Sequence, residues 1–353
     1  MRYPEFLRDG GTIGFVAPSF GCATEPYRSL FDHALTRWRR EGYKTVLGPN
    51  AYRSDGIGIS TAPEACGREL TEAWCSPESD VLISCGGGEL MCETMDHVDF
   101  DRIRDAAPKW YMGYSDNTNF TFLLNTLCDT AAIYGPCAAS FGMKPLHPAL
   151  KDAKAVLRGQ LRTLRGYRSF EAESRKDENN PFAPYHLNRR RRILSFDGER
   201  LLPLRPEGEP AAVEMEGRLT GGCLDILVNL AGTRYDRVKE FTRRYREEGV
   251  VWFLEACDLS VFAIRRALWE LDSAGWFENA KGFLFGRPLA AFGQESMGLD
   301  LLGAELAPLT KYHVPILLDL DIGHLPPMMP LISGCHAKVR CAGQDFALTM
   351  ELK

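Results

Sequence analysis

Residues 109–127, KWYMGYSDNTNFTFLLNTL, pass from a short apolar run through a tight turn into a longer apolar run. The first part, 109–112, predicts a buried strand, and 117–127 predicts the helix that follows it. The segment GYSDN (113–117) is confined to the turn between them. A strand that runs directly into a helix is part of a βαβ unit, so this stretch predicts a parallel sheet.

The same alternation extends upstream through the first 150 residues. Short apolar runs predict strands at 12–17, 45–47 and 80–84, and amphipathic runs predict helices at 27–40 and 63–75. These alternating elements favour a flavodoxin-like domain with a parallel sheet.

The pattern breaks at 166–212 and resumes from 217. The break contains a charged and amide-rich stretch and the run Arg189-Arg190-Arg191-Arg192, which we interpret as a solvated connector rather than an anion site. Beyond it, strands are expected at 250–254, 282–285 and 314–318, and a helix over 261–271. A length of 353 residues suits about two domains. We therefore expect an α/β protein with an N-terminal parallel-sheet domain (1–165), a polar interdomain segment (166–212) and a C-terminal α/β domain with its own sheet (213–353).

Composition excludes several classes of protein. Hydrophobic residues make up 45% and charged residues 25%, values typical of a globular chain with a sizeable core. A net charge of −5 argues against a nucleic-acid partner. The sequence has no apolar run of about 18 residues that would span a membrane, and its start lacks the apolar core of a signal peptide. The expected location is the cytoplasm.

Eleven cysteines raise the question of metals and disulfides. Their number is odd and no Cys-x-x-Cys pair occurs, so we expect reduced thiols and no structural zinc. In the segment CHAKVRC (335–341), alternation places residues 335, 337, 339 and 341 on one face of a strand.

Four predicted strand ends carry residues capable of chemistry, and each also has a structural interpretation. Ser115 lies in a strand-to-helix turn that would expose its hydroxyl, although capping of the helix by Ser115 or Asp116 is the better interpretation of the pattern alone. Glu255 ends an apolar strand, where an ion pair is an equal alternative. His324 follows the strand near 320, and a lone histidine is more often structural. Together they supply a nucleophile, a base and an acid to orient the base.

The fourth strand end is the glycine run 86–88. Three glycines let the backbone approach a ligand closely and offer N–H groups to an anion. The run matches neither the Walker nor the dinucleotide-binding pattern. Its amides are therefore candidate oxyanion donors, with a simple tight turn as the alternative.

These residues, in this order, resemble the LD-carboxypeptidase family of serine peptidases, which includes the microcin C immunity proteins. The resemblance runs through nearly the whole chain, and its most specific elements are GYSD at 113–116 and GH at 323–324. The other matching segments are GFVAPS (14–19), CGGG (85–88), YGP (134–136), LTGG (219–222), AGT (231–233) and FLE (253–255).

The resemblance implies roles for five residues. Ser115 would be the nucleophile, His324 the general base and Glu255 its orienting carboxylate, while the backbone N–H groups of Gly87 and Asp116 would form the oxyanion hole. It also implies catalysis without a metal or cofactor and, commonly, a homodimer. The order serine, glutamate, histidine would place the site where the two domains meet.

The activity implied is hydrolysis of an L,D-amide, such as the bond to the terminal D-alanine of a murein tetrapeptide, with a role in murein recycling. The alternative is hydrolysis of an aminoacyl- or peptidyl-nucleotide toxin, as in microcin C immunity, whose phosphate the run Arg189 to Arg192 could attract. A third is a binding protein without turnover. Cys223 stands where the family frequently has asparagine, and Asp321 where an aromatic is frequent. Residues 166–212 contain no tryptophan of the kind that stacks on adenine in the immunity proteins, although Phe170, Phe182, Tyr185 or Phe196 could substitute.

Overall fold

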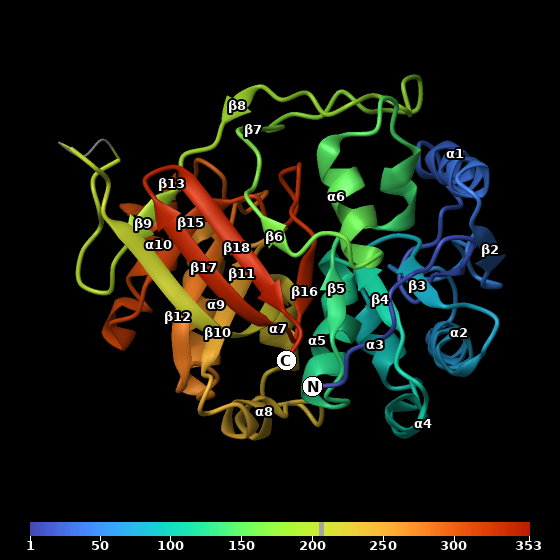
Figure 1. Ribbon diagram of the computed structural model, residues 1–353, viewed down its shortest axis with the longest axis horizontal. Coiled ribbons are helices and arrows are strands. Elements are labelled where there is room, and N and C mark those ends of the chain that lie inside the picture. The colour runs from blue at the N-terminus through green and yellow to red at the C-terminus, as the bar shows by residue number, and fades with distance from the viewer. Residues whose placement is uncertain (205–207) are drawn as a thin grey trace. The chain divides into compact units, whose positions relative to one another are not determined.

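The computed structural model describes residues 1–204 and 208–353 in two compact units (Figure 1). The first unit comprises Met1–Leu161, Glu173–His186 and Pro330–Ser333, and the second Arg162–Ala172, Leu187–Met329 and Gly334–Lys353. Residues 205–207, part of the predicted polar segment, lie outside the described residues. The expected division into folding domains at 165 and 212 stays a prediction. No helix in the described part of the chain is long and apolar enough to cross a membrane.

The first unit is built on a six-stranded sheet in the order β16-β5-β4-β3-β1-β2. The five strands from β2 to β5 are parallel, in the flavodoxin-like order 2-1-3-4-5. β16 adds an antiparallel edge beside β5. The elements are β1 (Thr12–Val16), α1 (Tyr27–Arg40), β2 (Lys44–Leu47), α2 (Pro63–Cys75), β3 (Val81–Ser84), α3 (Met91–Met95), α4 (Phe100–Asp105), β4 (Trp110–Gly113), the 3₁₀ turn η1 (Ser115–Asn117), α5 (Thr118–Thr126), β5 (Ala132–Tyr134), the 3₁₀ turn η2 (Ala138–Gly142), α6 (Pro148–Leu157) and β16 (Leu331–Ser333).

The second unit carries a mixed eight-stranded sheet in the order β6-β18-β17-β10-β11-β12-β15-β9. The strands β10, β11, β12 and β15 are parallel to one another. Figure 1 shows β10, in yellow, beside β17 and β18, in red, and β10 runs antiparallel to β17. The elements are β6 (Thr163–Leu164), β7 (Ser169–Phe170), β8 (Arg189–Arg190), β9 (Leu194–Phe196), β10 (Ala212–Cys223), α7 (Leu224–Leu230), α8 (Val238–Arg244), β11 (Val250–Glu255), α9 (Val261–Ser273), β12 (Ala280–Gly286), β13 (Glu295–Ser296), β14 (Leu299–Asp300), α10 (Leu301–Leu306), the 3₁₀ turn η3 (Thr310–Tyr312), β15 (Ile316–Leu320), β17 (His336–Ala342) and β18 (Asp345–Glu351).

The predicted fold class is confirmed: each unit is α/β and has its own sheet. The helices predicted at 27–40 and 63–75 have these bounds in the structure. The last predicted strand begins two residues late, at Ile316, because Pro315 has no N–H to give to a central ladder. The predicted helix at 117–127 is preceded by the 3₁₀ turn 115–117 and occupies 118–126.

The cysteines are all free thiols. The side chains at 335, 337, 339 and 341 are buried, as predicted for one face of a strand, while Lys338 and Arg340 are exposed. The alternation fails at His336, which is also buried because it pairs with Glu216 and Glu248.

Candidate active site

Ser115 stands at the turn between β4 and α5 with a left-handed backbone (φ 64°). A residue other than glycine pays a steric cost in this region, commonly about 1–3 kcal/mol, and such outliers gather at functional sites. The N-cap positions of η1 and α5 are held by Tyr114 and Asn117, neither of which makes a side-chain cap. Neither Ser115 nor Asp116 therefore occupies an N-cap position, so the predicted helix cap is wrong. A strained strand-to-helix turn of this kind is the geometry that a nucleophile elbow requires.

Asn117 occupies the position where a nucleophile elbow usually has a second glycine. Its amide donates hydrogen bonds to the carbonyl oxygens of Gly86 (2.8 Å) and Tyr114 (3.1 Å), and its carbonyl accepts one from the Tyr111 hydroxyl. The side chain lies directly over Gly113, where an added Cβ would come within 2.8 Å of it. Asn117 thus fastens the elbow to the glycine loop, a role that the sequence pattern did not reveal.

The glycine loop brings a backbone segment against the Ser115 side chain. A Cβ added to Gly87 would lie 3.1 Å from Cβ and 3.2 Å from Oγ of Ser115, so only glycine fits here without displacing its neighbours. The loop is held by a hydrogen bond from the Phe20 N–H to the Gly87 carbonyl (2.7 Å). The N–H of Asp116, the residue after Ser115, belongs to the first turn of a helix, where amides lack intrahelical acceptors.

The Asp116 side chain points into the protein and anchors the turn. Its carboxyl accepts hydrogen bonds from the Ser19 hydroxyl (2.5 Å), the Met91 N–H (2.9 Å) and the Asn119 amide (3.0 Å). Burial raises the pKa of this carboxyl to about 6, and the hydrogen bonds from Ser19 and Met91 oppose the rise. The serine of the GFVAPS segment therefore helps to position the elbow.

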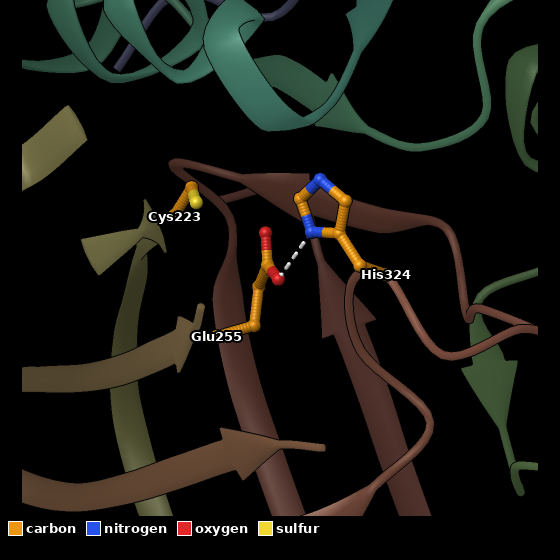
Figure 2. A group of neighbouring side chains, drawn as sticks. All are labelled: Cys223, Glu255 and His324. Carbon is orange, nitrogen blue, oxygen red and sulfur yellow. Dashed lines mark hydrogen bonds and ion pairs between the residues drawn. The ribbon is translucent and has the colours of Figure 1, made fainter. Parts of the chain in front are cut away.

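Glu255 and His324 meet at the carboxyl edge of the second sheet (Figure 2). Glu255 is the last residue of β11, and His324 lies in the loop that follows β15. Nδ1 of His324 lies 2.7 Å from Oε2 of Glu255, and the side chains are 10% and 0% exposed. Such a carboxylate fixes the tautomer that keeps Nε2 available as a base.

Gly323 makes this pairing possible. Its backbone is left-handed (φ 90°), and a Cβ added there would lie 2.2 Å from Oε2 of Glu255. The close approach of Glu255 therefore explains why glycine precedes His324, which the sequence alone did not reveal.

The electrostatics of the pair favour a protonated imidazole. Burial lowers the pKa of His324, but the charge of Glu255, with hydrogen bonds to Cys257 and Glu255, outweighs it and raises this pKa well above its usual value. The same environment stabilises the imidazolium that forms when the histidine accepts a proton.

Asp321 anchors the loop that carries His324. Its buried carboxylate accepts hydrogen bonds from the Tyr167 N–H (2.6 Å), from Arg287 (2.5 Å) and from Arg191 (3.3 Å). One arginine of the 189–192 run is thus a buried structural partner. Asp321 stands where the family frequently has an aromatic residue, and its carboxylate is what allows these pairings with arginine.

Cys223 joins Glu255 and His324 in the only group of possible metal ligands in the described part of the chain. The three ligand atoms lie within 4.8 Å of one another (Figure 2), and zinc accepts thiolate, carboxylate and imidazole. Burial and the charges of Glu255 and Asp225 raise the pKa of the Cys223 thiol well above its usual value, so it stays protonated and is a poor ligand. The donor set fits a metal badly, and metal-free catalysis stays a prediction.

The five predicted site residues fall into two groups. Gly87, Ser115 and Asp116 lie together in the first unit, and Glu255 and His324 lie together in the second. One unit offers a serine on a strained turn beside backbone amides, and the other a buried carboxylate–histidine pair.

The chain is a hydrolase of the serine peptidase type, because the models of one peptidase family match both of its halves. The chain belongs to the LD-carboxypeptidase family: the model of the family's N-terminal domain matches residues 13–135, and that of its C-terminal domain matches 216–339.

Relatives and solved structures agree with this family. A Streptomyces coelicolor protein whose name includes the word carboxypeptidase is 26% identical over 91% of this chain and 94% of its own. A Bacillus subtilis protein named "Probable murein peptide carboxypeptidase" is 24% identical over 96% of this chain and 92% of its own. The microcin C7 self-immunity protein MccF, solved with aspartyl sulfamoyl adenosine, has the same fold, with a TM-score of 0.79, 21% identity and full coverage of both chains.

Proposed function

We propose that this protein is a serine carboxypeptidase that hydrolyses an L,D-amide, such as the bond to the terminal D-alanine of a murein tetrapeptide. The observation that carries the proposal is Ser115, held in a left-handed conformation against Gly87, in a chain that also builds a buried Glu255–His324 pair. The name of the Bacillus subtilis relative supports a murein peptide as substrate.

In the proposed reaction, the hydroxyl oxygen of Ser115 attacks the scissile carbonyl while Nε2 of His324 takes its proton. The N–H groups of Gly87 and Asp116 stabilise the tetrahedral oxyanion, commonly worth about 3–4 kcal/mol for one donor. His324 then protonates the departing amine of D-alanine, and water hydrolyses the acyl-enzyme by the same route. Glu255 holds the imidazole throughout. The reaction needs no metal and no cofactor.

The test is release of D-alanine from a murein tetrapeptide, followed by mass spectrometry. Wild type and the control Ser296→Ala, which changes an exposed serine, should release D-alanine, and Ser115→Ala should lower the rate by at least about 10³-fold, since it removes the nucleophile. Release at the wild-type rate by Ser115→Ala would refute the assignment of the nucleophile. Release by none of the three proteins would reject the murein substrate.

A second candidate is hydrolysis of an aminoacyl or peptidyl nucleotide. Its support is the common fold with MccF, which has been solved with aspartyl sulfamoyl adenosine. Two of the aromatic residues that could stack on a base in this chain already pack on histidines. Phe182 packs on His33, and Tyr185 packs on His147. Binding of a non-hydrolysable acyl-sulfamoyl adenosine would support this candidate, and no binding at millimolar concentration would reject it.

A further inference from the structure

The second unit contains a cavity of about 900 Å³ at the carboxyl ends of β12 and β15. This volume is typical of sites for small organic ligands. Strand β8 and helix α10 contribute further walls. Neither Glu255 nor His324 is among the residues that line it, so the cavity is separate from the carboxylate–histidine pair.

The charged side chains that line the cavity carry both signs in equal number. The guanidinium groups are those of Arg189, Arg190, Arg192 and Arg287, and the carboxyl groups are those of Glu295, Asp300, Glu305 and Asp319. A ligand with a single charge would meet repelling groups as well as attracting ones. A ligand that carries one charge of each sign has a partner for both, so the lining is complementary to a zwitterion.

Three of the arginines are available to the negative end of such a ligand. Arg189, Arg190 and Arg192 have exposed side chains. Across residues 1–204 and 208–353, their guanidinium groups form no ion pair and no hydrogen bond, whereas that of Arg287 forms two ion pairs of its own. An uncommitted guanidinium group can bind a carboxylate through two parallel hydrogen bonds.

Glu305 is the group available to the positive end. Its side chain lines the cavity, is 5% exposed and has no hydrogen-bond partner among the described residues. Burial, with the nearby charge of Asp319, raises the pKa of its carboxyl well above the usual value. A buried polar group without a partner is costly, and an ammonium group in the cavity would satisfy it and stabilise its ionised form.

Other carboxyl groups of the lining are already held by backbone amides. Asp319 accepts a hydrogen bond from the Arg192 N–H (2.7 Å), and Asp300 accepts one from the Gly303 N–H (2.7 Å). The backbone of Asp319 is also left-handed (φ 62°), a strain that in residues other than glycine gathers at functional sites. These bonds leave Glu305 as the buried acid without a partner.

The uncharged part of the lining suits an aliphatic side chain. Leu194, Leu302 and Leu318 contribute to it. An aliphatic group that packs against these leucines is removed from water, which favours binding.

We propose that this cavity binds the zwitterion of an aliphatic α-amino acid. Its ammonium group donates a hydrogen bond to Glu305, and its carboxylate accepts hydrogen bonds from the three uncommitted arginines. Its side chain lies against Leu302 and Leu318. The proposal does not depend on the proposed peptidase activity.

Isothermal titration calorimetry on the full chain tests the proposal, with L-leucine as the probe. The matched ligands are 4-methylpentanoate, which is leucine without its ammonium group, and 3-methylbutylamine, which is leucine without its carboxylate. We expect L-leucine to bind at least about tenfold more tightly than either, since it alone supplies both charges.

Proton release provides a second readout. An ammonium group beside Glu305 favours the ionised carboxylate, so binding of L-leucine should release up to about one proton at neutral pH. Titrations in two buffers that differ in ionisation enthalpy measure this number. In Glu305→Gln the release should be absent.

Substitutions on the two sides of the cavity should affect different ligands. Glu305→Gln keeps the size of the side chain but cannot become negatively charged, so it should bind L-leucine at least about tenfold more weakly and 4-methylpentanoate as wild type does. Its control is Glu69→Gln, because Glu69 is also 5% exposed but lies outside the cavity. The Arg189→Ala/Arg190→Ala variant should bind both L-leucine and 4-methylpentanoate more weakly.

The control for the arginines is Arg243→Ala/Arg246→Ala, which removes two exposed arginines outside the cavity and should bind L-leucine like wild type. Three results would overturn the proposal: no binding of L-leucine at about 10 mM, equally tight binding of either matched ligand, and equal loss of affinity in Glu305→Gln and Glu69→Gln. Thermal unfolding of each variant separates loss of the site from loss of the fold.

Discussion

At the scale of single residues, Gly323 leaves no room for a side chain beside Glu255. Gly323→Ala would place a methyl group 2.2 Å from Oε2 and displace the carboxylate that holds His324. We expect kcat/KM for D-alanine release to fall roughly 100-fold, the scale of effect of a misplacement of about 1 Å. Steady-state kinetics checks this.

The matched control is Gly298→Ala, because Gly298 is also left-handed (φ 80°) but has no atom within 4 Å of an added Cβ. Both variants carry a backbone cost of about 1–2 kcal/mol in thermal unfolding. Only Gly323→Ala should also lose activity, and Gly298→Ala should keep the activity of wild type. Equal activity in the two variants would contradict the role given to Gly323.

The Glu255–His324 pair predicts a particular dependence of activity on pH. Because the pKa of His324 is raised well above its usual value, kcat/KM of wild type should fall as the pH drops through that raised pKa. In Glu255→Gln the stabilising charge is gone and burial lowers the pKa. The acid limb should therefore move to lower pH, while the rate at neutral pH falls by roughly 10⁴-fold.

The stability of the fold depends on pH in the opposite direction from the activity. A raised histidine pKa contributes stability that is fully present below the unfolded value of about 6.5 and is lost as the pH rises through the folded value. The control for both measurements is Glu216→Gln, which removes the carboxylate 2.6 Å from His336 in the same sheet. An acid limb that moves equally in both variants, or in neither, would contradict the assignment.

At the scale of elements, the β4–α5 turn depends on Asn117. Asn117→Ala removes the hydrogen bonds to Gly86 and Tyr114 and leaves the Tyr111 hydroxyl without this acceptor. We expect thermal unfolding to show a loss of about 1–3 kcal/mol. We also expect kcat to fall, because the glycine loop is released from the elbow.

The comparison is Asn125→Ala on α5, the helix that follows this turn. Asn125 donates a hydrogen bond to the Ser333 carbonyl (3.4 Å) and accepts one from its hydroxyl (2.5 Å). It should destabilise the protein to a similar extent and leave kcat unchanged. Equal kcat losses in the two variants would show that Asn117 acts only through stability.

Local patterns predicted some elements and missed others for identifiable reasons. The apolar spacing of Leu30, Phe31, Ala34 and Trp38 was sufficient to predict α1. The three-residue strand β16 was not predicted, because its pairing with Ala132–Tyr134 joins positions about 200 residues apart. The long strand β10 was also missed, since its partner β17 lies more than 100 residues later in the chain.

The site shows the same division. Motifs were sufficient to propose Ser115, Glu255 and His324 as site residues, and their roles stay predictions. The hydrogen bonds of Asn117, Asp116 and Asp321 are tertiary contacts that no single stretch of sequence encodes. The pattern also favoured a helix cap at Ser115, because a sequence does not report a left-handed φ. The run 189–192 was interpreted as a connector, whereas Arg191 forms a buried ion pair.

At the scale of the whole molecule, the proposed chemistry needs residues from both units. Ser115 belongs to one, and Glu255 and His324 to the other. The cytoplasmic location and the homodimer stay predictions, and sedimentation equilibrium would test the latter.

The central claim is that Ser115 and His324 act as one catalytic unit, and a double-mutant comparison tests it most directly. The measurement is kcat/KM for D-alanine release in Ser115→Ala, His324→Ala and the variant with both changes. Members of one triad are strongly non-additive, so the double variant should be no slower than the slower single variant. Losses that multiply in the double variant would show that the two residues act independently and would contradict the claim.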